Sequence, residues 1–524
     1  MNTSKINDIS KKLLIVFFWL QPVLDLVSNV FDESCFSIFG ICYTTLMRFG
    51  IFAAVLFLTI IANIKKKITL VFIGYLMVYA IFVFMHQLNI RSSDFLPDND
   101  ISYNIIKCAV FVARYIMPVC IAFFVYILEF DYKSFKVAIF GAIIFVIMVV
   151  LVTNIIGKDY ISYQYGSTAN PFGSIFSWFS DEICVTNWRM YTSRGLYETG
   201  NSLAAFLSLI LPVTTYIAFK EKKNLLFVLV ALQMVTMLLC GTKISVYGAI
   251  ILVAINVGIW VFDLIFNKKR FEIKKITAIF CVAVFFGVFF FYSPFLSRIK
   301  SGEGFSTNHS EVQSEKNDSD IEIDELDEFD TFDDVENGFT DKVDVSKFDH
   351  EAKLVYVLKN YQHHYIPSVL IKEIYDYNEH TDFWFDFMTK VDFNERNNSR
   401  KIKMLVLEDM LKNKGDALDA WVGIGETINP ETDFTFLYYS YGIIGLLLFV
   451  GPFVGVLLFS IISVLIQLFK RKFDDFSYIL ILSLGFSLVT AFYAGHVFNY
   501  YFVNVFVGLI AGMLTNAIRT RTSQ

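Results

Sequence analysis

The sequence predicts an all-α, polytopic integral membrane protein with about 12 transmembrane helices. Of its 524 residues, 55 % are hydrophobic and only 18 % are charged, whereas roughly 25 % of the residues in a soluble domain are charged. The apolar residues form blocks of about 18 to 25, long enough for a helix to cross a hydrocarbon core roughly 30 Å thick. Short charged or aromatic connections separate these blocks.

Each apolar block, read against its flanks, gives one predicted span. The twelve spans cover residues 12–31, 41–62, 68–87, 105–129, 136–156, 200–219, 224–240, 244–266, 276–295, 442–468, 475–494 and 500–518. If the N-terminus is cytoplasmic, alternating crossings put every Lys and Arg cluster of the connections on the cytoplasmic side. We therefore predict a multi-pass protein of the cell membrane with both termini in the cytoplasm.

This topology divides the chain into three predicted regions. Residues 1–295 form a nine-helix membrane region with outer loops at 88–104 and 157–199. A large extracytoplasmic loop follows at 296–441, and residues 442–524 hold the last three helices and a basic cytoplasmic tail.

The large loop changes character along its length. Residues 302–350 are strongly acidic, which predicts a disordered or loosely attached insert. A calcium loop is an alternative for the alternating acids, but the central Gly and the terminal Glu are missing at the required spacing. Apolar residues then recur at three and four spacing, so residues 351–441 are predicted to form a helical cap.

Two arginines lie inside predicted spans, where each charge costs at least about 2.5 kcal/mol. Arg48 and Arg114 are expected roughly 10 to 14 Å below the outer surface, within reach of the outside by snorkelling. One interpretation is that they bind an anion. The alternative is that they pair with acids such as Asp25 in neighbouring helices and only fix the packing.

Further candidates for anion binding lie at the outer face. Arg194 precedes the sixth predicted span. This span begins with Gly200-Asn201-Ser202, which is typical of a helix start, and the free N–H groups near Asn201 also favour an anion. Lys243 lies in the tight turn between spans seven and eight, although a Lys in an outer turn needs no functional explanation. If the four cations converge, their cavity suits a pyrophosphate.

Two carboxylates stand at the end of the large loop, in the stretch VGIGETINPETDFTFLYYSYGIIG (422–445). Asp433 and Glu431 are candidates for a general base if burial raises the pKa. His363, His364 and His496 are competing candidates, but a solvated helix face explains the first two and an interfacial position the third.

These features together resemble the O-antigen ligase and polysaccharide polymerase family. The resemblance is carried by about twelve spans, RGLYETGN at 194–201, the small-residue turn GTK at 241–243, and the large outer loop before the last three spans. The run GIG, ETDF and YGIIG between 423 and 445 resembles the signature that closes this loop in Gram-positive members. Where ligases of outer-membrane bacteria carry Arg in the turn and His near the loop's end, this chain has Lys243 and Asp433.

The resemblance implies a GT-C-like architecture and an activity. Such an enzyme moves a glycan from polyprenyl pyrophosphate to a hydroxyl of an acceptor glycan or cell-envelope polymer, at the outer face and without metal or cofactor. Its partners are these substrates and membrane lipids, with no nucleic acid. Arg194, Lys243, Arg48, Arg114 and Asn201 would bind the pyrophosphate, and Asp433 or Glu431 would accept the proton.

The aromatic outer loop 157–199 has two interpretations. Its ring side chains would stack on sugars in a glycan site, or they would anchor the loop at the membrane interface. The residues concerned are Tyr160, Tyr163, Tyr165, Trp178 and Trp188.

Two other functions remain open from the sequence. A lipid-linked oligosaccharide flippase or other polytopic transporter also fits twelve spans, but paired helix-breaking Gly and Pro residues in two matching halves are missing. The second function is that of a receptor or sensor that binds a partner through the acidic insert. The sequence contains no phosphate-binding loop for a nucleotide, so an activated donor must supply the energy.

Overall fold

The computed structural model describes residues 3–31, 37–38, 41–92, 105–162, 173–180, 188–221, 223–270, 272–300, 348–361, 366–391, 399–413, 415, 417–426 and 428–522. Long apolar helices dominate this part of the chain. They are α1 (Thr3–Val30), α2 (Tyr43–Asn63), α3 (Lys67–Ser92), α4 (Ile105–Ile127), α5 (Tyr132–Ile155), α7 (Gly200–Glu221), α8 (Asn224–Cys240), α9 (Lys243–Phe266), α10 (Ile273–Tyr292), α17 (Asp433–Phe449), α18 (Gly451–Phe469), α19 (Asp475–Tyr493) and α20 (Tyr501–Thr522).

Shorter elements connect them. They are the antiparallel strands β1 (Ser37–Ile38) and β2 (Ile41–Cys42), the 3-10 helices η2 (Ile175–Phe179) and η3 (Trp188–Tyr191), the π-helix η5 (Leu370–Ile374), and the helices α11 (Pro294–Lys300), α12 (His350–Asn360), α13 (Thr381–Lys390), α15 (Ser399–Asn413) and α16 (Asp419–Val422).

The protein is a polytopic, helical membrane protein, as the composition predicts. Within the described residues, ten helical segments are long and apolar enough to cross a membrane. Two shorter apolar helices, Val112–Ile127 and Asn224–Cys240, lie on the other two predicted spans. The count of twelve crossings itself stays a prediction.

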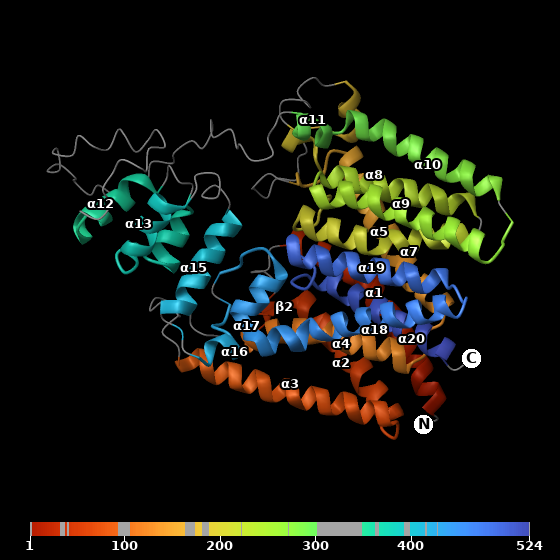
Figure 1. Ribbon diagram of the computed structural model, residues 1–524, viewed down its shortest axis with the longest axis horizontal. Helices are drawn as coiled ribbons and strands as arrows, with labels where there is room; N and C mark the ends of the chain where they lie inside the picture. Colours follow the sequence, from red (N-terminus) through yellow and green to blue (C-terminus); the bar gives the residue numbers. More distant parts are fainter. Residues whose placement is uncertain are drawn as a thin grey trace.

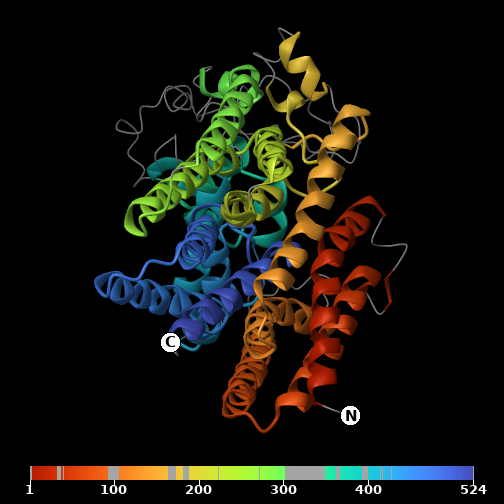
Figure 2. The ribbon, with the colours of Figure 1, turned by 90° about the vertical axis from the view of Figure 1, so that its right-hand side faces the viewer.

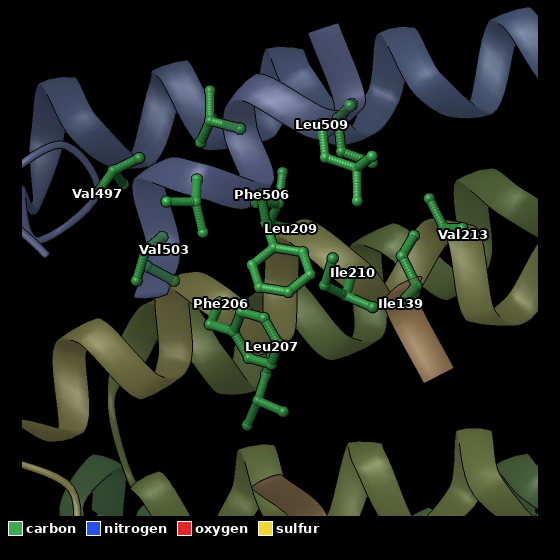
Figure 3. Close-up of a cluster of buried hydrophobic side chains, with 14 of the residues drawn as sticks. Ile139, Phe206, Leu207, Leu209, Ile210, Val213, Val497, Val503, Phe506 and Leu509 are labelled. Carbon is green, nitrogen blue, oxygen red and sulfur yellow. The ribbon is translucent and has the colours of Figure 1, made fainter. Parts of the chain in front are cut away.

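The helices α7 and α20 form the centre of the bundle, and nearly all of their apolar residues are buried. Figure 3 shows Phe206 of α7 facing Phe506 of α20, with ring centroids 5.1 Å apart. On another side α20 touches the backbone of α4. A Cβ atom at Gly508 would lie 2.4 Å from the carbonyl oxygen of Pro118, so this small-residue face permits close helix packing.

Both chain ends lie at the same end of the helix bundle, and the helices α12, α13 and α15 lie at the other (Figure 1). Figure 2 views the bundle from the end that carries the termini, with the teal helices behind it. We call the two ends the terminal end and the cap end. Which of the two ends faces the cytoplasm stays a prediction.

The helices at the cap end have a hydrophobic core of their own. Trp384 is completely buried there, and its indole nitrogen donates to the carbonyl oxygen of Tyr375 over 2.9 Å. The same core reaches Ile424 and Ile428, just before α17. The segment between α11 and α17 is therefore folded over part of its length, and this folded part is joined to the loop that begins at Gly423.

The predicted span 442–468 is two helices in the structure, α17 and α18. The helix α17 begins earlier, at Asp433, and breaks at Gly442, whose φ of 66° is one that L side chains rarely adopt. The break frees carbonyl groups, and the loop before α17 uses them. Ile424 N donates to Tyr439 O and Gly425 N to Ser440 O, each over 3.0 Å.

Candidate active site

A polar cavity of about 790 Å³ opens at the cap end of the bundle, where α1, α2, α4, α17 and α20 meet the loop before α17. Its lining includes three carboxylates and two arginines together with several amides and aromatic rings. The lining residues are Asp25, Ser28, Asn29, Phe31, Thr45, Arg48, Arg114, Tyr115, Glu198, Glu426, Ile428, Asn429, Phe436, Asn499, Tyr500 and Tyr501.

Arg48 lines this cavity and also pairs with an acid. Only 3 % of the residue is exposed, and its Nη2 donates to Asp25 Oδ1. The predicted pair with Asp25 is present and joins α2 to α1, and both residues also line the cavity. Anion binding by Arg48 stays a prediction.

Arg114 reaches the same cavity from α4. Its Nη1 donates to the carbonyl oxygen of Asn499 over 2.9 Å. The guanidinium carbon lies 4.8 Å from the ring centroid of Tyr501, and that of Arg48 lies 4.9 Å from the same centroid. One aromatic ring therefore contacts both cations and holds them close to each other.

Glu426 is the carboxylate that the loop before α17 presents to the cavity. The hydroxyl of Tyr441 donates to its Oε1. Burial raises the pKa of Glu426 above its ordinary value, although the hydrogen bond from Tyr441 and the charge of Arg114 act in the opposite direction. Glu426 is nevertheless an exposed residue, and it lines the cavity.

Asp433 occupies a different environment. It is fully buried at the start of α17, and its Oδ2 accepts hydrogen bonds from Val497 N over 2.8 Å and from Phe498 N over 3.0 Å. It is not among the residues that line the cavity. These contacts fasten the start of α17 to the turn before α20.

Glu431 also lies outside the cavity lining. Its carboxylate pairs with Arg400 Nε at 3.0 Å and with Lys403 Nζ at 3.4 Å, both from α15. Burial alone would raise its pKa, but the hydrogen bond from Arg400 and the two positive charges hold the pKa below its ordinary value. A carboxylate with a lowered pKa is a poor proton acceptor near neutral pH.

The remaining predicted ligands lie at or beyond the edge of the cavity. Arg194 donates to the carbonyl oxygen of Glu198, which lines the cavity, and packs 5.4 Å from the ring centroid of Tyr160. Asn201 is half-buried in the first turn of α7, and Lys243 is exposed at the start of α9. Neither of these two lines the cavity.

A buried network shapes the loop that carries Arg194. Asp159 is completely buried and accepts from the hydroxyl of Ser193, whose oxygen accepts in turn from Gly195 N over 3.1 Å. Burial raises the pKa of Asp159 to about 6. Ser193 N also donates to Leu239 O over 2.7 Å, which brings this loop beside the end of α8.

The histidine candidates are placed only in part. His363 and His364 lie outside the described residues. Burial lowers the pKa of His496 to about 4, and its ring packs on Tyr500 at 5.5 Å. This histidine is therefore neutral at pH 7 and a weak proton acceptor.

The aromatic loop is also described only in part. Trp178 is buried, and its indole nitrogen donates to Tyr191 O over 3.0 Å, so this ring serves the packing of the loop. Tyr163, Tyr165 and the side chain of Trp188 lie outside the described residues. Within the described residues, no group of three or more His, Cys, Asp or Glu side chains is arranged to hold a metal ion.

The sequence contained a signal for Glu426 that our site prediction did not use. This acid directly follows Gly423-Ile424-Gly425, and both glycines have φ near +87°. A Cβ atom at Gly423 would lie 2.2 Å from Ser440 O, so the loop must press against α17 at this point. An acid that immediately follows such a constrained turn has its direction fixed by the backbone.

The whole chain was compared with known proteins. A family model described as O-antigen ligase like membrane protein matches residues 7–521. A search of curated proteins and a search of solved structures return no match. The family match covers nearly the whole length, including every helix that contributes to the cavity. The chain belongs to the family of O-antigen ligase like membrane proteins.

Proposed function

We propose that this membrane enzyme of polysaccharide biosynthesis transfers a glycan from polyprenyl pyrophosphate to a hydroxyl of an acceptor glycan or cell-envelope polymer. The reaction takes place in the cavity at the cap end, on the outer side of the cell membrane, and needs no metal. One observation carries the proposal. The cavity combines two arginines with a solvent-accessible carboxylate of raised pKa.

The cations hold the leaving group. As the bond between the sugar C1 and the pyrophosphate oxygen breaks, negative charge grows on the pyrophosphate, and donors aimed at that charge stabilise the transition state. Arg48 and Arg114 fill this role because both line the cavity and share the ring of Tyr501. Arg194 supports them from the edge of the cavity, and Lys243 and Asn201 lie farther from it.

Glu426 acts as the general base. As the acceptor oxygen bonds to C1, its proton passes to the Glu426 carboxylate, and polyprenyl pyrophosphate leaves as the anion. We assign this role to Glu426 rather than to Asp433 or Glu431, because of these three acids Glu426 alone lines the cavity. Asp433 then serves to hold α17 in position, and Glu431 to hold α15.

A comparison of three acids tests the assignment, with the purified full-length chain and a lipid-linked donor. Glu426→Gln should lower transfer by about 10²-fold or more, the usual range for a lost general base. Asp433→Asn keeps an oxygen for Val497 N and Phe498 N, and Glu431→Gln lies outside the cavity, so both should retain most activity. If Asp433→Asn abolishes transfer and Glu426→Gln does not, Asp433 is the base.

The pH dependence gives an independent check. A base must be ionised, so wild-type activity should fall as the pH drops through the raised pKa of Glu426 and stay high above it.

In cells that carry Glu426→Gln, unextended lipid-linked units should accumulate in the outer leaflet. Accumulation in the inner leaflet would point to the transporter instead.

A further inference from the structure

A second cavity, of about 680 Å³, lies between α8 and α10. The two helices run side by side at the edge of the bundle in Figure 1. The lining is apolar for most of its length and turns polar at one end. It consists of Asn224, Phe227, Val228, Ala231, Leu232, Ile273, Lys274, Thr277, Ala278, Cys281, Val282 and Phe285. We call this cavity the α8/α10 groove.

The groove faces the surroundings of the bundle rather than its interior. In α10 only Val282 and Phe286 are buried, while neighbouring apolar side chains are highly exposed, with Phe280 at 66 %. The lining positions of each helix recur at three and four spacing, so they form one continuous face. In a bilayer this seam is open to lipid along its length.

The polar end of the groove is positively charged. It lies where α8 and α10 both begin. Lys223 directly precedes α8, and Lys274 lies in the first turn of α10. Neither helix start has a side-chain cap, so backbone N–H groups and the positive ends of the helix dipoles add to the charge. Lys274 itself lines the groove.

We propose that the α8/α10 groove binds one anionic phospholipid. An acyl chain lies along the apolar wall between Phe227 and Phe285, and the phosphate meets Lys274 at the polar end. Basic pockets between membrane helices bind anionic head groups in this manner. The combination of an apolar channel and a cationic end fits a lipid better than a soluble anion.

The occupant differs from the donor lipid of the proposed reaction. Both helix starts that form the charged end lie at the terminal end of the bundle (Figure 1). Arg48 and Arg114 lie at the cap end. A polyprenyl pyrophosphate with its head group among these arginines has its head group at the opposite end from Lys274, so the two lipid sites are independent.

Lipid binding to the full-length chain tests the proposal, by native mass spectrometry with added phosphatidylglycerol or phosphatidylcholine. We expect phosphatidylglycerol to bind more tightly than phosphatidylcholine. Lys274→Gln should weaken the binding of phosphatidylglycerol about five-fold, which is the effect of one lysine near a head group. The matched control is Lys275→Gln. Lys275 is already held by Glu272 at 3.4 Å and lies 5.9 Å from the Trp260 ring centroid.

A second pair of variants tests the apolar wall without touching charge. Thr277→Trp should fill the groove and reduce retention of phosphatidylglycerol, whereas Ala283→Trp puts the same bulk at an exposed position outside the lining. The proposal is overturned if Lys274→Gln and Lys275→Gln bind phosphatidylglycerol alike. It also fails if phosphatidylcholine binds as tightly, or if polyprenyl phosphate displaces phosphatidylglycerol from the wild type.

Discussion

At the scale of single residues, Tyr501 organises the cavity without carrying a charge. Its ring lies within 4.9 Å of the guanidinium carbons of both Arg48 and Arg114. Two guanidinium groups repel each other, and the electron-rich face of a ring offsets part of that repulsion. The first residue of α20 therefore helps to hold two cations at one cavity.

We expect Tyr501→Leu to raise the KM for the lipid-linked donor about 5- to 30-fold, because a desolvated cation–π contact contributes roughly 1 to 2 kcal/mol. Tyr501→Phe keeps the ring and should stay within about three-fold of wild type. Steady-state kinetics with varied donor concentration measure both. Equal KM values for the two variants would show that the ring does not organise the arginines.

At the scale of elements, the broken helix α17 positions Glu426. The break at Gly442 lets Gly423-Ile424-Gly425 pair with the backbone of α17, and Glu426 follows directly. A Cβ atom at Gly442 would lie 2.3 Å from the carbonyl carbon of Trp421. The loop and the helix thus fit together only if this residue has no side chain.

Gly442→Ala should lower the melting temperature of the full-length chain and strongly reduce transfer. The strained φ alone costs about 1 to 3 kcal/mol, and the loop that carries Glu426 must shift. Gly455→Ala is the control, since Gly455 lies within α18 with no atom within 4 Å of an added Cβ. Thermal unfolding and donor turnover measure the two effects. If Gly442→Ala changes neither the melting temperature nor the turnover, this account is wrong.

The order of the helices could be predicted from the sequence because apolar blocks need no distant partner to be recognised. The kink at Gly442 could not, because FTFLYYSYG reads equally well as an interfacial loop. The positions of the acids relative to the cavity could not be predicted from the sequence either. Asp433 is separated from its partners Val497 and Phe498 by more than sixty residues, and only the folded chain shows that Glu426 faces the cavity instead.

At the scale of the whole molecule, both termini and the charged end of the α8/α10 groove share one end of the bundle. The positive-inside rule predicts that this end lies in the cytoplasm. In a chain without native cysteines, we expect Glu373→Cys, in the cap, to react with an impermeant maleimide in intact cells. Arg270→Cys, between α9 and α10, should react only after permeabilisation, and the opposite labelling pattern would reverse the topology.

The cavity joins the two ends of the chain, since Asp25 belongs to the first helix and Tyr501 to the last. Synthesis on the ribosome begins at the N-terminus, so Arg48 and Arg114 enter the membrane hundreds of residues before the ring that they share. The site is completed only when the final helix has been inserted. If glycan transfer takes place in this cavity, as we propose, a chain that is interrupted during translation cannot carry out the reaction.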